Sequence, residues 1–399
     1  MKTGLYFYDS GNSRMLAFNL ETNTAISLPT THFNPSLPTL LCIHGWSKDD
    51  MIQSWGPRIP SFQGEVLSNE NYARMWKQPS ATVYGTDYDL IPTARDKKPS
   101  DHDVSYGTSI SVMHNHTNKL PVAYNIAFFD WVEYADENEV KDAEAKLWKA
   151  LNGFKNMRRR LPDGTYTTDR VLAISVCEAI AKSLCAFISS TTNPYQQEIR
   201  IVGHSLGGQA AINVAKIVGD FHGQSQYLKC PKPSRVELCD PFWSNGAKAY
   251  LTVEPRWTGE RCTWYAQQLA GKGVAIGHYR TSPISTSPFV GDANLGLNSY
   301  AALHNVCFWW TLDVVVKHKA ALEWYLWSIC HGQTVECTIN ICNTRKATGE
   351  QAGSAACPTW RLFRMAEQSN HWVQVEGRYN KNPTECWFQR KAGMNGDLI

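Results

Sequence analysis

Short apolar runs alternate with longer helical patterns along much of the chain. The apolar runs are rich in Val, Ile, Leu, Phe and Cys and are too short for helices, which is typical of buried strands. They are Thr39–Ile43, Ile126–Phe129, Ile199–Val202 and Val236–Cys239. Nearer the start, Leu5–Tyr8 and Met15–Asn19 flank a turn-forming stretch at residues 9–12, and this arrangement predicts a β-hairpin.

Helical periodicity separates several of these strands. Val171–Phe187 has an apolar residue at every fourth position, as expected for one face of a helix. Its apolar positions are Leu172, Val176, Ile180 and Leu184. Gln209–Val218 and Val306–Val316 are further predicted helices. Strands that alternate with helices predict an α/β fold, with a mostly parallel central sheet and helices on both of its faces.

The size and composition of the chain favour one large folded unit. The chain has 399 residues, of which 43% are hydrophobic and 19% are charged, so it supports a large core and global disorder is excluded. We expect a catalytic domain over residues 1–330 and a small Cys-containing extension, residues 331–399, packed on it. Polar insertions are expected near residues 85–120 and 136–168, the second of them partly helical.

The charge pattern and the start of the chain bear on partners and compartment. The net charge is +3 and no long Lys/Arg run is present, which disfavours a nucleic-acid partner. No run of about 18 consecutive apolar residues occurs, so no transmembrane segment is expected. The first residues lack the apolar region of a signal peptide. We therefore expect either a cytoplasmic protein or a secreted one whose signal peptide has been removed.

The 12 cysteines leave the compartment open. Some lie in strand-like or helix-like runs, where a thiol acts as a small apolar side chain. They are Cys42, Cys177, Cys185 and Cys239. Others have loop-like spacing near the end of the chain and favour a disulfide-linked tail; the absence of a Cys-x-x-Cys pair makes a zinc site the weaker alternative. These are Cys330, Cys337, Cys342, Cys357 and Cys386.

The strongest chemical signal is the sequence Gly-His-Ser-Leu-Gly-Gly at residues 203–208. The pattern G-x-S-x-G is weak alone, but here a predicted strand precedes it and a predicted helix follows it. Such a turn lifts the hydroxyl of Ser205 above the sheet at a helix N-terminus, where N–H groups favour negative charge. Gly203, His204 and Gly207 complete this elbow, and the glycines are needed because only tiny residues fit beside so tight a turn. A bystander Ser in a Gly-rich turn is the alternative.

Five motifs, in chain order, resemble those of the pancreatic-type lipase and phospholipase A1 family within the α/β-hydrolase superfamily. They are Cys42-Ile43-His44-Gly45-Trp46 with Trp55, then Phe128-Phe129-Asp130-Trp131, Gly203–Gly208, Leu238-Cys239-Asp240-Pro241, and His304 ahead of Phe308-Trp309-Trp310. The resemblance implies an α/β-hydrolase fold and Ser-His-Asp chemistry. The long insertions and the short C-terminal region depart from the family, so substrate preference carries over less well than fold and chemistry.

A Ser hydroxyl needs an imidazole base, and the base needs an orienting carboxylate. α/β-Hydrolases supply these groups in the order Ser, acid, His. Asp240 ends a strand and precedes Pro241, so we expect its carboxylate at the carboxyl edge of the sheet. His304 is our choice of base, because a loop precedes it and an apolar helix is expected to follow. His278 and Asp292 remain the alternative base and acid.

The tetrahedral intermediate of acyl transfer needs two N–H donors facing its oxyanion. One should be the backbone N–H of Leu206, directly after the nucleophile. The other should be the backbone N–H of Trp46, in the loop after the first long strand. His44 is expected to be structural and to hold this loop by a hydrogen bond.

These features predict a serine-dependent carboxylic-ester hydrolase, a lipase or phospholipase A1-like lipid esterase that needs no metal and no cofactor. Its substrate would be a lipid or another apolar ester, with interfacial contact to a lipid surface, and residues 85–120 or 242–275 would cover Ser205. Several Trp residues flank the expected site and suit an acyl pocket, with core packing as the plainer alternative. They are Trp46, Trp55, Trp131, Trp243, Trp309 and Trp310. A non-catalytic lipid-binding or interaction protein on the same fold is the alternative function.

Overall fold

The computed structural model describes the larger part of the chain. The described residues are 3–8, 14–46, 124–149, 157–191, 194–227, 229–283, 291–309, 312–331, 334–339, 345–378 and 386–394. The predicted insertion at residues 85–120 lies outside them, as do Trp55, Trp310 and Cys342 and the side chain of Cys330.

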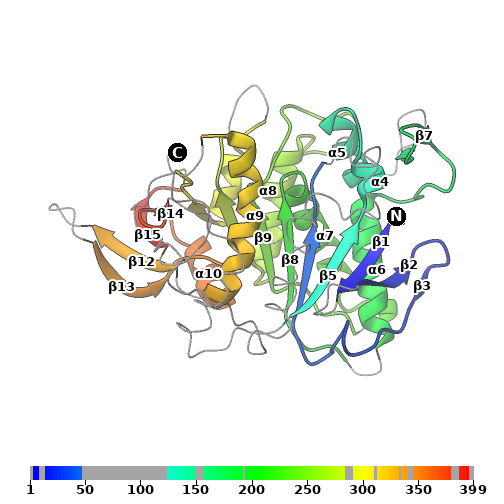
Figure 1. Ribbon diagram of the computed structural model, residues 1–399, viewed down its shortest axis with the longest axis horizontal. Helices are drawn as coiled ribbons and strands as arrows, with labels where there is room; N and C mark the ends of the chain where they lie inside the picture. The colour runs from blue at the N-terminus through cyan, green and yellow to red at the C-terminus, as the bar shows by residue number, and fades with distance from the viewer. Residues whose placement is uncertain are drawn as a thin grey trace, which may run out of the picture.

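The fold is α/β and is built on one 13-stranded sheet, which Figure 1 shows as a twisted fan from β13 to β3. The strand order is β13-β12-β15-β14-β11-β10-β9-β8-β4-β5-β1-β2-β3. The strands are β1 (Gly4–Tyr8), β2 (Arg14–Asn19), β3 (Thr24–Ala25), β4 (Thr39–Ile43), β5 (Asn125–Asp130), β8 (Ile199–His204), β9 (Arg235–Cys239), β10 (Ala275–Arg280), β11 (Ala302–Asn305), β12 (Val335–Ile339), β13 (Arg345–Gln351), β14 (Asn370–Gln374) and β15 (Trp387–Ala392).

The middle of the sheet, from β5 through β14, is parallel throughout. Antiparallel pairs occur only towards its two ends among the described strands. Central parallel strands are covered on both faces, and β4 is accordingly buried at every position. The predicted α/β class and the mostly parallel sheet are confirmed, as is the predicted hairpin, formed by β1 and β2.

Helices cover both faces of the sheet. They are α4 (Val132–Ala135), α5 (Val140–Trp148), α6 (Val176–Ser190), α7 (Gly207–Phe221), α8 (Thr258–Gly271), α9 (Val314–His331) and α10 (Thr359–Ala366). Two short 3-10 helices are η3 (Ser225–Tyr227) and η4 (Leu295–Ser299), and a separate two-stranded ribbon joins β6 (Arg159–Arg160) to β7 (Tyr166–Thr167). The insertion at 136–168 is therefore partly helical, as predicted.

Alternate residues along the strands feed two separate cores. Leu41 and Ile43 of β4 belong to the core that holds α6, α7 and α8, whereas Leu40 and Cys42 belong to the core that holds α9 and α10. This alternation follows from the strand period of two, which sends successive side chains to opposite faces. The helices thus cover the middle of the sheet on both of its faces.

Two predicted helices begin later than expected. α6 begins at Val176 because Ser175 and Glu178 form a capping box there, so the prediction from residue 171 is wrong by one turn. The helix predicted over Val306–Val316 is wrong for most of its length, because α9 begins only at Val314. Asp313 sets that start, since its Oδ1 accepts the backbone N–H groups of residues 315 and 316 at 2.8 and 3.2 Å.

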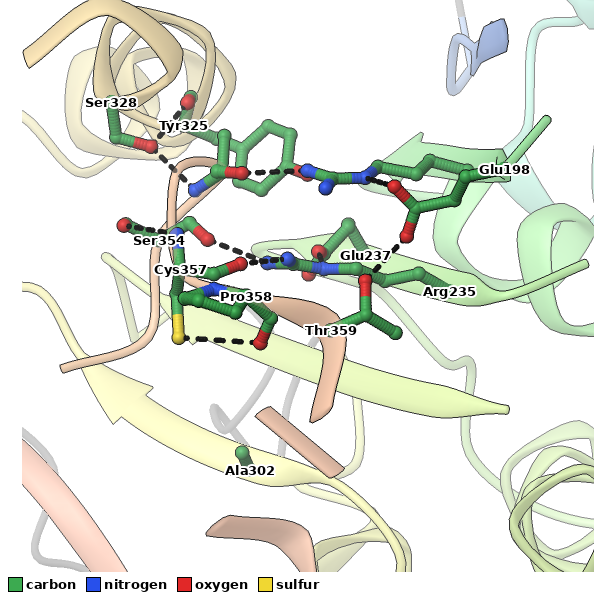
Figure 2. Close-up of polar contacts among 12 residues, drawn as sticks. Glu198, Arg235, Glu237, Ala302, Tyr325, Ser328, Ser354, Cys357, Pro358 and Thr359 are labelled. Atoms are coloured by element: carbon green, nitrogen blue, oxygen red, sulfur yellow. Dashed lines mark hydrogen bonds and ion pairs between the residues drawn. The ribbon is translucent and has the colours of Figure 1, made fainter. Parts of the chain in front are cut away.

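The described part of the 331–399 region continues the sheet. β14 pairs in parallel with β11, and β15, β12 and β13 add on outside it. Two arginines of neighbouring strands hold the segment 352–357 against this sheet (Figure 2). Arg235 donates to the carbonyls of Ser354 and Cys357, and Arg200 donates to the carbonyl of Ala355. The predicted extension is therefore joined to the main domain by strand pairing and by buried charge.

Residues 242–275 connect β9 to β10, and parts of this segment are packed into the core. Trp243 is fully buried, and α8 contributes Cys262, Ala266 and Leu269 to the core beside α7. Glu144, also fully buried, accepts hydrogen bonds from Ser244, Tyr250 and Thr258 and ties this connection to α5. Trp243 and α8 thus belong to the packed core, whereas residues 244–256 are mostly exposed or half-buried, so the lid expected at 242–275 stays a prediction.

The cysteines that the structure describes are all buried, Cys337, Cys357 and Cys386 of the C-terminal region among them, and no two of them are bonded to each other. The structure therefore shows no disulfide among the described cysteines of that tail. Within the described ranges, every helix is too short or too polar to cross a membrane.

Candidate active site

Ser205 lies on a sharp turn between β8 and α7, near the centre of the sheet (Figure 1). Its backbone N–H donates to the carbonyl of Cys239 on the neighbouring strand β9 at 3.1 Å. The φ angle of Ser205 is +55°, a left-handed conformation that residues other than glycine rarely adopt. Such strain costs about 1–3 kcal/mol and collects at functional sites. The predicted strand–turn–helix elbow is present.

The glycines of the elbow are required by close packing. A Cβ atom on Gly203 would overlap the carbonyl group of Gly207, and one on Gly207 would overlap the carbonyl oxygen of Ile43. α7 therefore approaches β8 and β4 so closely that neither glycine has room for a side chain. The spacing of Gly, Ser and Gly is a direct consequence of this geometry.

The loop after β4 lies directly against the elbow. A Cβ atom on Gly45 would come within 2.9 Å of the Cβ of Ser205 and within 3.2 Å of the backbone nitrogen of Leu206. The indole N–H of Trp46, one residue further on, donates to the carbonyl of Glu137 at 2.6 Å. The two predicted oxyanion donors, Trp46 and Leu206, therefore belong to two segments in contact.

His44 stabilises the loop after β4 through a hydrogen bond and ring stacking. Its Nδ1–H donates to the carbonyl of Gly45 at 2.8 Å, and its ring stacks on Trp131 with centroids 5.1 Å apart. The indole N–H of Trp131 donates in turn to the carbonyl of His44 at 3.1 Å. Burial lowers the pKa of His44 to about 3, against a smaller opposing effect of the Gly45 bond, so the ring stays neutral. The prediction that His44 is structural is confirmed.

Asp240 follows β9 directly and is fully buried. Its Oδ1 accepts the backbone N–H groups of Thr281 at 2.9 Å and Ser282 at 3.2 Å, and its Oδ2 accepts the Ser282 hydroxyl. Burial alone would raise the pKa of Asp240. The hydrogen bond and charge of His318, together with the bonds from Ser282 and Thr281, outweigh burial and hold the pKa below its ordinary value. The carboxylate is therefore ionised at neutral pH.

The imidazole that meets Asp240 is that of His318, not that of His304. His318 lies in the second turn of α9, and its Nδ1–H donates to Oδ2 of Asp240 at 2.7 Å. Its side chain keeps 11% of its surface exposed. Because Nδ1 is occupied by Asp240, Nε2 is the nitrogen left to exchange a proton with a neighbouring group. The prediction that His304 is the partner of Asp240 is wrong.

His304 is instead part of the core between β10 and β14. It lies on β11, fully buried, with its ring stacked between Tyr279 and Trp372. Its Nδ1–H donates to the carbonyl of Ala302 at 3.0 Å, and its Nε2 accepts the backbone N–H of Gly353 at 2.8 Å. Burial lowers its pKa to about 3. Both ring nitrogens are used, so His304 has no nitrogen to offer to a substrate.

The sequence contained one signal that could have pointed to His318. Because of the apolar run from residue 306, the predicted helix began too early. His304 was then chosen as the base because it lies just ahead of that predicted start. Asp313 is a typical N-cap residue just ahead of Val314 to Val316, and it marks the true start. With the helix begun there, His318 falls in its second turn, where its flanking Lys317 and Lys319 suggest no more than a solvated helix face.

The other two candidates have partners elsewhere. His278, on β10, is buried and donates from Nδ1 to the side-chain oxygen of Asn298 at 3.0 Å. Asp292 accepts the backbone N–H of Asn294 at 2.8 Å, as an Asp in a turn does. Neither residue replaces Asp240 or His318.

The flanking tryptophans divide into two groups. Trp131 and Trp243 are fully buried in the core, which agrees with the plainer alternative. Trp46 and Trp309 are exposed to 38% and 40%. Trp46 directly follows Gly45, which contacts the elbow, and the exposure of so large an apolar side chain there favours an apolar ligand.

Among the described residues, no group of three or more His, Cys, Asp or Glu side chains is arranged to hold a metal ion. The chain matches no protein-family model and no curated protein.

Proposed function

We propose that the protein is a serine-dependent carboxylic-ester hydrolase with an α/β-hydrolase fold. The observation that carries the proposal is the Asp240–His318 hydrogen bond of 2.7 Å at the strand ends beside the strained elbow of Ser205. A nucleophile, an imidazole and an ionised carboxylate are the groups that acyl transfer requires. The order along the chain, Ser205, Asp240 and then His318, is the order of α/β-hydrolases.

In the proposed reaction, the hydroxyl oxygen of Ser205 attacks the carbonyl carbon of the ester while Nε2 of His318 takes the hydroxyl proton. Asp240 keeps Nδ1 of His318 protonated and stabilises the imidazolium that forms. The tetrahedral intermediate collapses to an acyl-enzyme when His318 returns the proton to the leaving alcohol. Water, activated by the same imidazole, then attacks the acyl-enzyme and releases the acid.

The oxyanion of each intermediate is proposed to bind at the contact between the loop after β4 and the elbow. The backbone N–H groups of Trp46 and Leu206 are the proposed donors. Leu206 precedes the first turn of α7, where unpaired N–H groups and the helix dipole favour negative charge. Loss of one such donor typically costs about 3–4 kcal/mol of transition-state stabilisation.

An apolar ester is the proposed substrate class. The first residues of α9 and the turn ahead of it expose Leu312 to 93%, Val315 to 54% and Val316 to 38%, close to His318 in sequence. Trp46 and Trp309 add exposed aromatic surface. Exposed apolar patches of this kind bind apolar ligands or lipid surfaces. They support an esterase for lipids or similar apolar substrates, with the resemblance to lipases and phospholipases A1 as the further guide.

The test is hydrolysis of p-nitrophenyl butyrate by the full chain and by Ser205→Ala. We expect measurable turnover by the natural protein and a loss of kcat of about 10⁴-fold or more in the variant. Ser189→Ala is the matched control, because this serine of α6, whose hydroxyl oxygen is buried, lies outside the site and should leave kcat unchanged. Full activity in Ser205→Ala would refute the proposal, and no turnover by the natural protein would favour a non-catalytic binding protein.

A further inference from the structure

His204, the residue directly before the proposed nucleophile, contacts the proposed base in two ways. Its Nε2–H donates to the backbone carbonyl of His318 at 2.9 Å. Its ring also packs on the ring of His318, with centroids 4.6 Å apart and an angle of 39° between the planes. The last residue of β8 therefore fixes both the backbone and the ring of a residue that lies on a distant helix.

A second side chain binds the neighbouring carbonyl of the same helix. The hydroxyl of Thr281 donates to the carbonyl of Lys317 at 2.9 Å. Thr281 and Ser282 also donate their backbone N–H groups to Asp240. Two successive carbonyls of α9 are thus bound by the segment that carries Ser205 and by the segment that holds Asp240.

We propose that His204 is a positioning residue that holds His318 in register with Ser205 and Asp240. The inference rests on the proposed function, and it adds a role for a residue that neither attacks the substrate nor carries its proton. The hydrogen bond fixes where α9 stands relative to β8, and the ring contact fixes the plane of the His318 imidazole. Misplacement of a reacting group by about 1 Å can cost about 100-fold in rate.

The protonation state of His204 suits this role. Burial, together with the charges of His318 and Lys319, lowers its pKa to about 3, against the smaller opposing effects of its hydrogen bond to the His318 carbonyl and of Asp240. A neutral imidazole that donates from Nε2 keeps the same hydrogen bond over the whole working pH range. A second cation beside the imidazolium of His318 would oppose catalysis, and the neutral ring avoids it.

The test compares His204→Gln, His204→Phe and His204→Ala in the full chain. An amide nitrogen of Gln can still donate to the carbonyl of His318, whereas Phe keeps a ring without a donor and Ala keeps neither. We expect kcat for p-nitrophenyl butyrate to fall about 10–100-fold in the Ala and Phe variants, with KM within about threefold, and to be largely restored in the Gln variant. His371→Ala is the matched control, because His371 donates in the same way to the carbonyl of Gly393 far from the site.

The pH profile separates positioning from a general loss of stability. If His204 sets the Asp240–His318 bond, the acid-side midpoint of kcat/KM moves to lower pH in the Ala and Phe variants, because the imidazolium loses part of its carboxylate partner. The midpoint should stay in place in His204→Gln and His371→Ala. A lower melting temperature with kcat and midpoint unchanged would overturn the proposal, as would an equal loss of kcat in the Gln and Ala variants.

An NMR titration of His318 keeps this test independent of the proposed reaction. The Cε1–H signal, assigned with His318→Gln, should titrate at a lower pH in His204→Ala than in the natural protein. If the natural protein hydrolyses no ester but this shift appears, the proposed function fails and the positioning role stands. If hydrolysis occurs and neither kcat nor the titration changes, the positioning role fails alone.

Discussion

Two buried polar clusters of this molecule use their hydrogen bonds in different ways. The site cluster consists of Asp240, Ser282 and His318 at the carboxyl ends of the strands. The anchor cluster consists of Arg235 on β9, which Figure 2 shows, and His304 on β11, and it holds the segment 352–357. Both side-chain partners in the site cluster bind Asp240, whereas Arg235 and His304 of the anchor cluster each bind the backbone of a distant segment.

The difference shows which buried groups remain available for chemistry. Both ring nitrogens of His304 are bonded, and the guanidinium of Arg235 is fully buried between Glu237 and two carbonyls. His318 has its Nδ1 on Asp240, and its side chain keeps 11% of its surface exposed, so part of it stays accessible. A buried group whose hydrogen-bonding atoms are all bonded to the protein contributes stability. A buried pair in which one nitrogen is not used by the pair itself can exchange a proton. We therefore expect substitutions in the site cluster to lower the reaction rate, and substitutions in the anchor cluster to lower the free energy of unfolding.

The largest expected effect is that of Asp240→Asn. Without the carboxylate, His318 loses the partner that fixes its tautomer and stabilises its imidazolium, and we expect kcat to fall about 10⁴-fold. Steady-state hydrolysis of p-nitrophenyl butyrate measures it. The matched control is Glu237→Gln, a buried carboxylate on the same strand β9, whose loss should lower stability and leave kcat of the folded enzyme unchanged. Equal losses of kcat in both variants would remove the distinction between the clusters.

The next effect belongs to the anchor cluster. Arg235→Met leaves Glu237 and the carbonyls of Ser354 and Cys357 buried without a donor, and breaking such a buried pair costs about 3–5 kcal/mol. Urea unfolding measures the free energy of unfolding. Lys272→Met breaks an exposed ion pair with Asp220 and should cost about 0–1 kcal/mol. An Arg235→Met protein as stable as the natural one would show that the segment 352–357 needs no anchor.

A smaller effect is expected for Ser282→Ala. The hydroxyl donates to the ionised Asp240, and a hydrogen bond to a charged group contributes about 1.5–3 kcal/mol. We expect kcat/KM to fall about 10-fold or more, because the carboxylate loses one of the bonds that orient it. Ser183→Ala is the control, since its hydroxyl donates only to the carbonyl of Ala179 within α6. A loss of stability with an unchanged kcat/KM would assign Ser282 to folding alone.

The smallest effect is a difference in the pH dependence of stability. The folded pKa of Asp240 is lowered from its ordinary 3.8, so its contribution is present above about pH 4 and is lost as the pH falls through the lower folded value. The folded pKa of Asp130 is raised to about 6, chiefly by burial, so its contribution declines as the pH rises from about 4 to 6. Urea unfolding of Asp240→Asn and Asp130→Asn against the natural protein should show opposite slopes. Slopes of the same sign would contradict this assignment.

The sequence predicted the scaffold well because local signals agree with the fold. The apolar run Thr39–Ile43 is β4 residue for residue, since a strand buried on both faces needs apolar side chains throughout. The Gly-x-Ser-x-Gly elbow was readable because steric limits around Gly203 and Gly207 leave few alternatives. Asp240 was found because it ends a strand, and the end of a parallel strand is a place that local sequence can reveal.

The proposed base, His318, was missed because its position depends on tertiary structure. A continuous apolar stretch from Val306 concealed the start of α9, and only the N-cap Asp313 marked it. His304 follows a predicted loop, which made it a candidate base. In the structure its Nε2 accepts a hydrogen bond from Gly353, a residue of the C-terminal segment that packs beside β11. No local sequence pattern indicates that His304 and Gly353, so far apart in sequence, are in contact. The resemblance to lipases assigned the His motif to His304 on β11, one element before α9, which carries His318.

The most direct test is the site of reaction with a fluorophosphonate probe, compared between two histidine variants. The probe forms a covalent adduct with an activated serine, and mass spectrometry identifies the labelled peptide. We predict labelling of Ser205 in the natural protein, labelling at least about 100-fold slower in His318→Gln, and labelling at the natural rate per folded molecule in His304→Gln. Labelling that needs His304 and not His318, or a label on a serine other than Ser205, would contradict the account.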